Sequence, residues 1–333
     1  MIRLLRRVLT LVPDPFLFGL VIAATLGTLL PCSGPAETAF RVLLVAMIAL
    51  MFFMQGVRLS RAAVIAGMTH WRVHLAILAC TFVLYPILGL ALKAAAAPLL
   101  PGPLWLGVLF LCLLPSTVQS SIAYVSIAKG NVAAAVCAAT ASNLIGVFLT
   151  PTLASLLLHT QGEGPSLSEI WKVAANILAP FVLGQILQPR LAAWAAKNKG
   201  LLTFSDRGAI LLAVYIAFSA AALQGVWSAI PPLSMLYLLL LEAVLLGIVL
   251  AATYFGARAA GFAREDQIAI VFCGSKKSLA SGAPMASVLF PAATLSVVMI
   301  PLVLFHQMQL VASAFIAKKW ANDAEEKPAT AGS

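Results

Sequence analysis

The sequence predicts an all-α polytopic membrane protein with about ten transmembrane helices. The chain has 333 residues, of which 62% are hydrophobic and 10% charged, and its mean hydropathy is +1.02. A soluble domain carries about 25% charged residues. Apolar runs of roughly 17–25 residues, long enough to cross a bilayer as helices, recur along the chain, and short basic segments separate them. This pattern leaves no room for a sizeable soluble domain, and the net charge of +10 does not indicate nucleic-acid binding.

The positions of Lys and Arg orient these runs. Most of the 21 basic residues fall in connections on one side. Because basic loops stay in the cytoplasm, we expect both termini there, in a bacterial-type inner membrane. Residues 319–333 are polar, and we expect a disordered cytoplasmic tail. The expected spans are 14–31, 39–58, 73–93, 104–128, 132–158, 170–189, 207–226, 233–257, 265–290 and 292–317.

Three short patterns recur in the same order in both halves of the chain. Five spans per half is an odd number, so the second half must enter the membrane from the opposite side. The pattern therefore predicts two inverted five-helix repeats, residues 1–160 and 165–318, as in alternating-access transporters. The recurring patterns are Pro15–Gly19 with Pro180–Gly184, Gln55–Val57 with Gln224–Val226, and the polar interruptions that begin at Ser116 and Ser275.

The first interruption breaks the fourth span after Pro115. Proline removes a backbone donor, and nearby hydroxyls can then bond to the freed backbone. One interpretation is a proline kink satisfied by its own serines. The other is a binding site, because matching interruptions in both halves indicate a central site in transporters. The candidate binding residues are Ser116, Thr117, Gln119, Ser120 and Ser121.

The second interruption places two lysines inside the ninth span, between Gly274 and Gly282. A lysine near the bilayer centre costs about 2.5–3.5 kcal/mol, so we expect a broken helix that faces protein or water. A lysine could cap the carbonyls of the first half-helix. The lysines and the next helix N-terminus could instead bind a carboxylate or sulfate, or one lysine could replace a coupling cation and release a proton during the cycle. The candidates are Ser275, Lys276, Lys277 and Ser278.

Other polar residues inside spans are further candidates. Glu242 is either a protonated or hydrogen-bonded packing residue or a counter-ion for the lysines. Thr140 and Asn143 share a helix face and either bind substrate or ion, or bond between helices. His306 and Gln307 are expected to line the site. The five scattered cysteines form no disulfide or metal pattern, no metal site is expected, and no enzyme motif is present.

Several segments together resemble the bile acid:sodium symporter superfamily, and most closely its SBF-like branch. The resemblance implies a core of spans 3–5 and 8–10 that rocks against a panel of spans 1, 2, 6 and 7, with the broken helices crossing in the core. Sodium-coupled relatives carry a glutamate and a downstream Gln-Asn in the ninth-span break, whereas this chain has Lys276 and Lys277, which argues against simple sodium coupling. The segments that carry the resemblance are Phe52–Leu59, His74 with Thr81 and Phe82, Pro115–Ser121, Gly130 and Asn131, Ser142–Phe148, Cys273–Ala280, and His306 with Gln307.

The predicted function is therefore secondary active transport of a small organic anion by alternating access, coupled to protons rather than sodium. One alternative is a non-transporting membrane regulator of ion homeostasis with the same fold. Another is an efflux carrier for a small inorganic or xenobiotic solute. The expected partners are the anionic substrate and the lipid bilayer, no cofactor is expected beyond a coupling ion (H⁺ or Na⁺), and the oligomeric state stays open.

Overall fold

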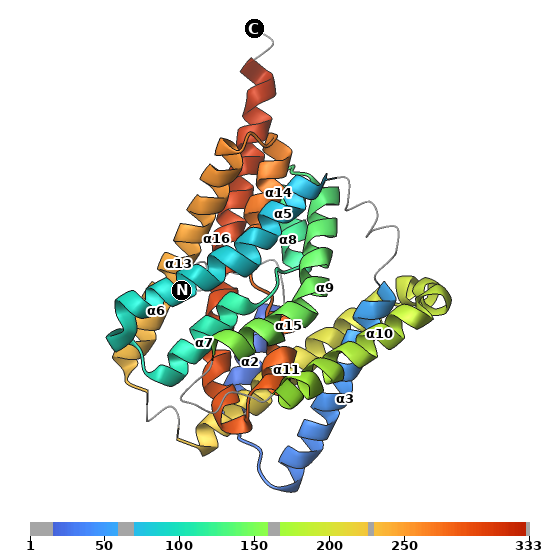
Figure 1. The fold of residues 1–333 in the computed structure, drawn as a ribbon, viewed down its shortest axis with the longest axis vertical. Helices are drawn as coiled ribbons and strands as arrows, with labels where there is room; N and C mark the ends of the chain where they lie inside the picture. Colours follow the sequence, from blue (N-terminus) through green and yellow to red (C-terminus); the bar gives the residue numbers. More distant parts are fainter. Residues whose placement is uncertain (1–15, 59–69, 159–166, 226–229, 331–333) are drawn as a thin grey trace, which may run out of the picture.

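The computed structural model describes residues 16–58, 70–158, 167–225 and 230–330, and every element in this part of the chain is helical (Figure 1). The predicted start of the first span, the boundary between the repeats at residues 160–165 and the last residues of the tail lie outside these ranges. The elements are α2 (Phe16–Leu29), α3 (Pro35–Arg58), α5 (Trp71–Ala79), the π-helical turn η2 (Cys80–Leu84), α6 (Tyr85–Ala96), η3 (Ala97–Leu99), α7 (Gly102–Leu113), α8 (Gln119–Ile127), α9 (Val132–Leu157), α10 (Leu167–Lys197), α11 (Lys199–Leu223), α13 (Pro232–Ala259), α14 (Arg264–Gly274), α15 (Leu279–Leu289) and α16 (Ala292–Thr330).

The helical lengths confirm a multi-pass membrane protein. Six helices in the described ranges are long and apolar enough to cross a bilayer. The predicted fourth and ninth spans are each split, into α7 with α8 and α14 with α15, so neither half reaches the spanning length by itself. The six spanning helices are Pro35–Arg58, Trp71–Leu99, Val132–Leu157, Lys199–Leu223, Pro232–Ala259 and Thr294–Asp323.

Two groups of helices pack against each other (Figure 1). We name α2, α3, α10 and α11 the panel, and α5–α9 with α13–α16 the core bundle. In the panel, α3 packs along α10 and α2 packs along α11. The α3–α10 contact depends on two glycines, because a Cβ on Gly184 would lie 2.0 Å from the Phe53 carbonyl oxygen and one on Gly56 would lie 2.2 Å from that of Phe181. The panel meets the core bundle where α11 contacts α15 and α16 and where α10 contacts α9 and α15.

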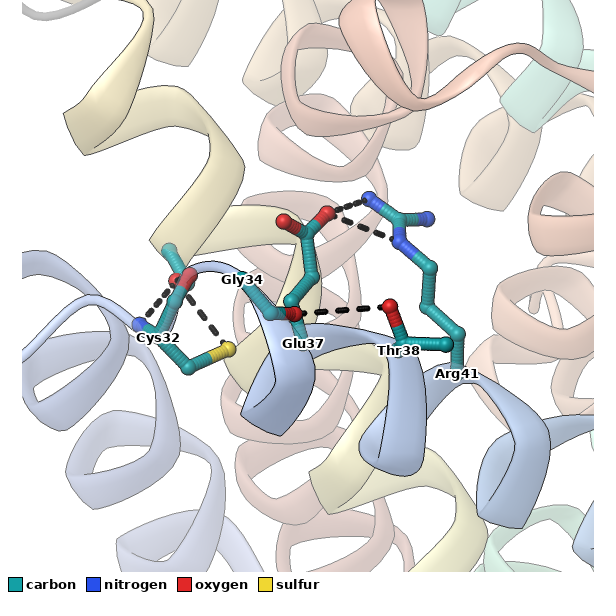
Figure 2. A network of polar contacts seen from close by, with 6 residues as sticks. Cys32, Gly34, Glu37, Thr38 and Arg41 are labelled. Carbon is teal, nitrogen blue, oxygen red and sulfur yellow. Dashed lines mark hydrogen bonds and ion pairs between the residues drawn. The ribbon is translucent and has the colours of Figure 1, made fainter.

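The turn between α2 and α3 attaches these helices to α11. The Ser219 hydroxyl accepts a hydrogen bond from the Cys32 backbone N–H at 2.7 Å. Figure 2 shows the first turn of α3, where Glu37 pairs with Arg41 at 2.6 Å and the Thr38 hydroxyl donates to the Gly34 carbonyl. Gly34 has φ +63°, which a residue with a side chain rarely adopts. These contacts fix one end of the panel.

Helix α16 is the central helix of the core bundle. Its spanning stretch is 67% buried, compared with 28–39% for the other five. It also continues as a helix to Thr330, where the sequence led us to expect a disordered tail from residue 319. Tertiary contacts explain the difference at its start, because the Trp320 ring lies 6.0 Å from that of Tyr254 and 4.5 Å from the Arg264 guanidinium. This packing holds the helix in place past the predicted end of the span.

Candidate functional site

The two helix breaks lie against each other in the core bundle. Helix α7 ends at Leu113 and α8 begins at Gln119, while α14 ends at Gly274 and α15 begins at Leu279. The Ser278 backbone N–H donates to the Pro115 carbonyl at 2.8 Å. Both breaks occur where the sequence predicts them, and this bond joins them directly.

Side chains of each break satisfy the carbonyl end of the opposite half-helix. From the first break, the Ser116 hydroxyl donates to the Cys273 carbonyl at 2.5 Å and the Ser121 hydroxyl donates to that of Phe272 at 3.0 Å. From the second break, the Lys277 ammonium donates to two carbonyls at the end of α7. The last carbonyls of a helix have no partners within the helix, so the two broken helices depend on each other.

Lys277 is enclosed by carbonyl oxygens. Its Nζ lies 2.7 Å from the Thr81 oxygen, 2.9 Å from that of Cys112 and 2.7 Å from that of Leu114. Three acceptors match the three N–H groups of an ammonium, and the Tyr85 ring lies 4.1 Å away. Thr81 belongs to η2, a π-helical turn, and such turns are frequent at functional sites. The predicted capping role is therefore realised on α7 and not on the lysine's own half-helix α14.

Lys276 is also fully buried but has a different environment. Its Nζ donates to the Ser120 carbonyl at 3.2 Å and lies 3.8 Å from the centre of the Tyr124 ring. Cation–π contact of this kind stabilises an ammonium that is removed from water. The charges of both lysines are thus directed at groups of the protein itself.

A cavity of about 500 Å³ lies between the core bundle and the panel. Seven of the predicted site residues line it: Thr117, Gln119, Ser120, Thr140, Asn143, Ser278 and His306. The other six predicted residues are buried and are not part of its lining: Ser116, Ser121, Glu242, Ser275, Lys276 and Lys277.

Two helix N-termini border this cavity. Residues at the start of α8 and residues 278–281 at the start of α15 both belong to its lining. The Ser278 side chain caps α15 by accepting from the Ser281 N–H at 3.1 Å. Because the first N–H groups of a helix carry partial positive charge, two such ends at one cavity favour a negatively charged group there.

Asn143 on α9 connects the two breaks. Its side-chain amide donates to the Ser116 carbonyl at 2.7 Å, and its amide oxygen accepts from the Ser281 hydroxyl at 2.6 Å. The nearby Ser142 hydroxyl accepts from the Ser116 N–H at 3.0 Å. Asn143 therefore lines the cavity and also forms hydrogen bonds between helices.

Gln309 is a site residue that sequence reasoning missed. Its side-chain oxygen accepts from the Lys277 N–H at 2.8 Å, its nitrogen donates to the Lys277 carbonyl at 2.8 Å, and the same nitrogen lies 3.0 Å from His306 Nδ1. Gln309 is fully buried. The available signal was its i,i+3 spacing from His306, which places both on one face of α16.

The panel adds charged residues that were not among the predicted site residues. Arg58 pairs with Asp206 at 2.7 Å, and both line the cavity together with Arg207. The Arg207 guanidinium lies 5.3 Å from the centre of the Phe16 ring. Arg58 is far in sequence from Asp206 and Arg207, and only the packing of α3 against α11 brings it close to them.

Glu242 is not paired with either lysine in the structure. It is fully buried in α13, and within the described residues neither of its carboxyl oxygens has a hydrogen-bond partner. A carboxylate buried without a partner is very unfavourable, so the neutral acid is the form that this environment accepts. The geometry thus agrees with a protonated packing residue, whereas the predicted counter-ion contact does not form.

The family assignment follows from the sequence comparisons. Residues 14–322 match the model of the SBF-like CPA transporter family. This chain belongs to that family. The match runs through both helix breaks and the helices that border the cavity, so the SBF-like fold includes the whole candidate site.

Relatives of this SBF-like protein align over nearly its full length. It is 50% identical to an uncharacterized protein, PA2026, of Pseudomonas aeruginosa, over 95% of this chain and 96% of the relative. It is 45% identical to YfeH of Escherichia coli, which is named only provisionally as a symporter, over 94% of each chain. It is 26% identical to sodium/bile acid cotransporter 7 of the mouse, over 92% of each chain. The family and these relatives indicate a membrane transporter with a small-molecule substrate, and the functional names among them describe transport, not catalysis.

Proposed function

We propose that this protein is a secondary active transporter that moves a small organic anion by alternating access. The observation that carries the proposal is the position of the cavity. It lies between two groups of helices, and the N-termini of α8 and α15 both contribute to its lining. Discontinuous helices whose positive ends face the substrate are how many secondary transporters bind anions.

The lining supports an organic anion rather than a small inorganic one. Besides its polar groups, the cavity has many apolar side chains: Phe16, Val118, Ala123, Ile127, Leu144, Phe181, Ile210, Leu279 and Leu310. A site of this kind uses apolar walls for affinity and a few polar groups for orientation. We expect the charged head of the substrate at the helix N-termini and its apolar body along the panel.

Helix packing supports ten spans in two inverted repeats. Suppose that α2–α9 form one repeat and α10–α16 the other. Replacing each helix of a contact by its equivalent in the other repeat should then give a second contact that is also present. The pair α2–α11 then corresponds to α3–α10, the pair α6–α7 to α13–α14, and the pair α7–α16 to α9–α14, and all six contacts are present. Two such units around one central site are typical of alternating access.

The positive-inside rule places the charged edge of the cavity toward the cytoplasm. Arg58 and Arg207 lie on the side that holds most basic residues, so we assign both termini and the cavity entrance to the cytoplasmic side of an inner membrane. Rocking of the core bundle against the panel would then open the cavity to the other side. Topology is tested by C-terminal reporter fusions, and an external reporter would contradict this assignment.

We assign coupling to protons rather than sodium because the Lys277 amine occupies a position suited to a coupling cation and can gain or release a proton. Its ammonium occupies a shell of three carbonyl oxygens, the kind of environment that a bound monovalent cation requires. Within the described residues, no carboxylate forms an ion pair or hydrogen bond with Lys277. Protonation of the amine adds the same charge that sodium binding would add.

The direct test is uptake by the purified protein in proteoliposomes. Naphthalene-2-sulfonate and 2-naphthylmethanol share an apolar body and differ in head group. We expect uptake of the sulfonate, dependent on an imposed pH gradient and unchanged when choline replaces sodium, and no saturable uptake of the alcohol. Asn143→Ala should reduce uptake because Asn143 joins both breaks, whereas Thr152→Ala, at an exposed position of the same helix, is the matched control. Protein that neither binds nor transports organic anions would overturn the proposal.

A further inference from the structure

We propose that Gln309 fixes His306 as a neutral hydrogen-bond donor toward the cavity, so that the site recognises acceptor head groups such as a carboxylate or sulfonate. The recognition part rests on the proposed function, whereas the state of the ring can be measured without transport. His306 lines the cavity and is 9% exposed, and Gln309 lies behind it in the core bundle.

The orientation of the Gln309 amide is determined by the backbone of Lys277. The Lys277 N–H can only donate, so the Gln309 atom at 2.8 Å from it must be the oxygen. The Lys277 carbonyl can only accept, so the atom at 2.8 Å from it must be the amide nitrogen. If the amide were reversed, the Gln309 nitrogen would face the Lys277 N–H, donor against donor. The Gln309 oxygen would face the Lys277 carbonyl, acceptor against acceptor.

The amide orientation then determines the state of His306. One N–H of the Gln309 nitrogen is used on the Lys277 carbonyl, and the second faces His306 Nδ1 at 3.0 Å. Nδ1 must therefore accept, so it carries no proton. In a neutral imidazole the proton then resides on Nε2. A doubly protonated ring would direct an N–H at the N–H of Gln309.

This arrangement gives the cavity a donor without adding a charge. His306 lies near the start of α15 in the lining, where the helix N-terminus also offers N–H groups. The charged groups of the same lining are Arg58, Asp206 and Arg207 on the panel wall. The hydroxyl and amide groups of the core wall can donate or accept, whereas the His306 N–H and the N–H groups at the helix start can only donate, so they favour an acceptor head group over an ammonium.

The ring state is tested by nitrogen-15 NMR of histidine-labelled protein, with the His306 signals assigned by comparison with His306→Gln. We expect an unprotonated Nδ1 and a protonated Nε2 at neutral pH. A proton on Nδ1 of the wild-type protein would overturn the inference, and this result needs no variant of Gln309. In Gln309→Glu, the new carboxylate can only accept, so we expect the proton to move to Nδ1.

Recognition is tested by binding of naphthalene-2-sulfonate, with 2-naphthylmethylammonium as the cationic counterpart. Loss of one hydrogen bond to a charged group should weaken sulfonate binding by about tenfold or more in His306→Leu. His306→Gln keeps a donor and should recover most of the affinity. Gln307→Leu is the matched control, because Gln307 is adjacent on α16 but does not line the cavity.

The two parts of the inference fail in different ways. Equal sulfonate affinity of His306→Leu and wild type, or equal binding of the ammonium probe, would refute the recognition role even if the tautomer is as expected. If wild-type protein binds no organic anion while the NMR result holds, the proposed transport function fails and the fixed tautomer stands.

Discussion

Replacing Lys277 by alanine removes the ammonium from its carbonyl shell and leaves three buried acceptors, the oxygens of Thr81, Cys112 and Leu114, without their donor. An orphaned buried acceptor costs about 1–3 kcal/mol, so three cost roughly 3–9 kcal/mol. Part of this is recovered because a charge no longer has to be buried. We expect a net loss of about 3 kcal/mol, measured as a lower Tm in detergent.

The same variant should gain a binding site for small monovalent cations. The vacated shell keeps three carbonyl oxygens and the face of the Tyr85 ring at its border. A cation that binds only the folded protein stabilises it by about 1.4 kcal/mol at ten times its Kd. Ammonium chloride should therefore raise the Tm of Lys277→Ala above the value in choline chloride at equal ionic strength.

Lys276→Ala is the matched control for this experiment. It removes a neighbouring buried lysine whose ammonium contacts one carbonyl and two aromatic rings, so its vacated space offers too few oxygens to hold a cation. Its Tm should not depend on the choice of ammonium or choline. Equal behaviour of the two variants, or a Lys277→Ala protein as stable as wild type, would refute the argument that the Lys277 ammonium occupies a cation site.

Three further predictions follow from the packing. Glu242→Gln should keep both Tm and uptake, since a neutral acid and an amide are similar; a loss of several kcal/mol would instead indicate a charged pair with a lysine. Gly184→Val should lower the Tm because its Cβ would lie 2.0 Å from the Phe53 carbonyl oxygen. Gly256→Val is the control and should not lower the Tm, because nothing lies within 4 Å of a Cβ at that position. Equal Tm values of the two variants would contradict the close α3–α10 contact. Arg58→Gln should cost less than about 1 kcal/mol of stability, as for other partly exposed ion pairs, yet raise the KM for naphthalene-2-sulfonate; an unchanged KM would remove Arg58 from the site.

Much of the fold follows from local features of the sequence. The predicted spans 132–158 and 233–257 correspond closely to α9 (Val132–Leu157) and α13 (Pro232–Ala259). Apolar length decides a span because each stretch must cross the same bilayer thickness. Pro115 and the charged Lys276–Lys277 pair indicate the breaks because proline removes a backbone donor and a lysine is costly in lipid. The tail is different, since Trp320 extends α16 through contacts with distant residues.

The roles of the site residues could be predicted only in part from the sequence. Thr117, Asn143 and His306 line the cavity as the sequence predicts, whereas the lysines lie behind it. The sequence places Lys277 beside the end of α14, but its four-carbon side chain reaches carbonyls of α7 and η2. Which carbonyls it reaches depends on how two helices cross, and no local pattern encodes that crossing.

By itself, the sequence determined that this is a polytopic helical membrane protein with two interrupted helices, because bilayer thickness and backbone hydrogen bonding act on short stretches of chain. Only the tertiary structure decided how those stretches meet. It placed the helix N-termini at the cavity, enclosed Lys277 in carbonyl oxygens, left Glu242 unpaired among the described residues and joined Gln309 to His306. These contacts join residues that are distant in sequence, so they depend on the packing of the whole bundle.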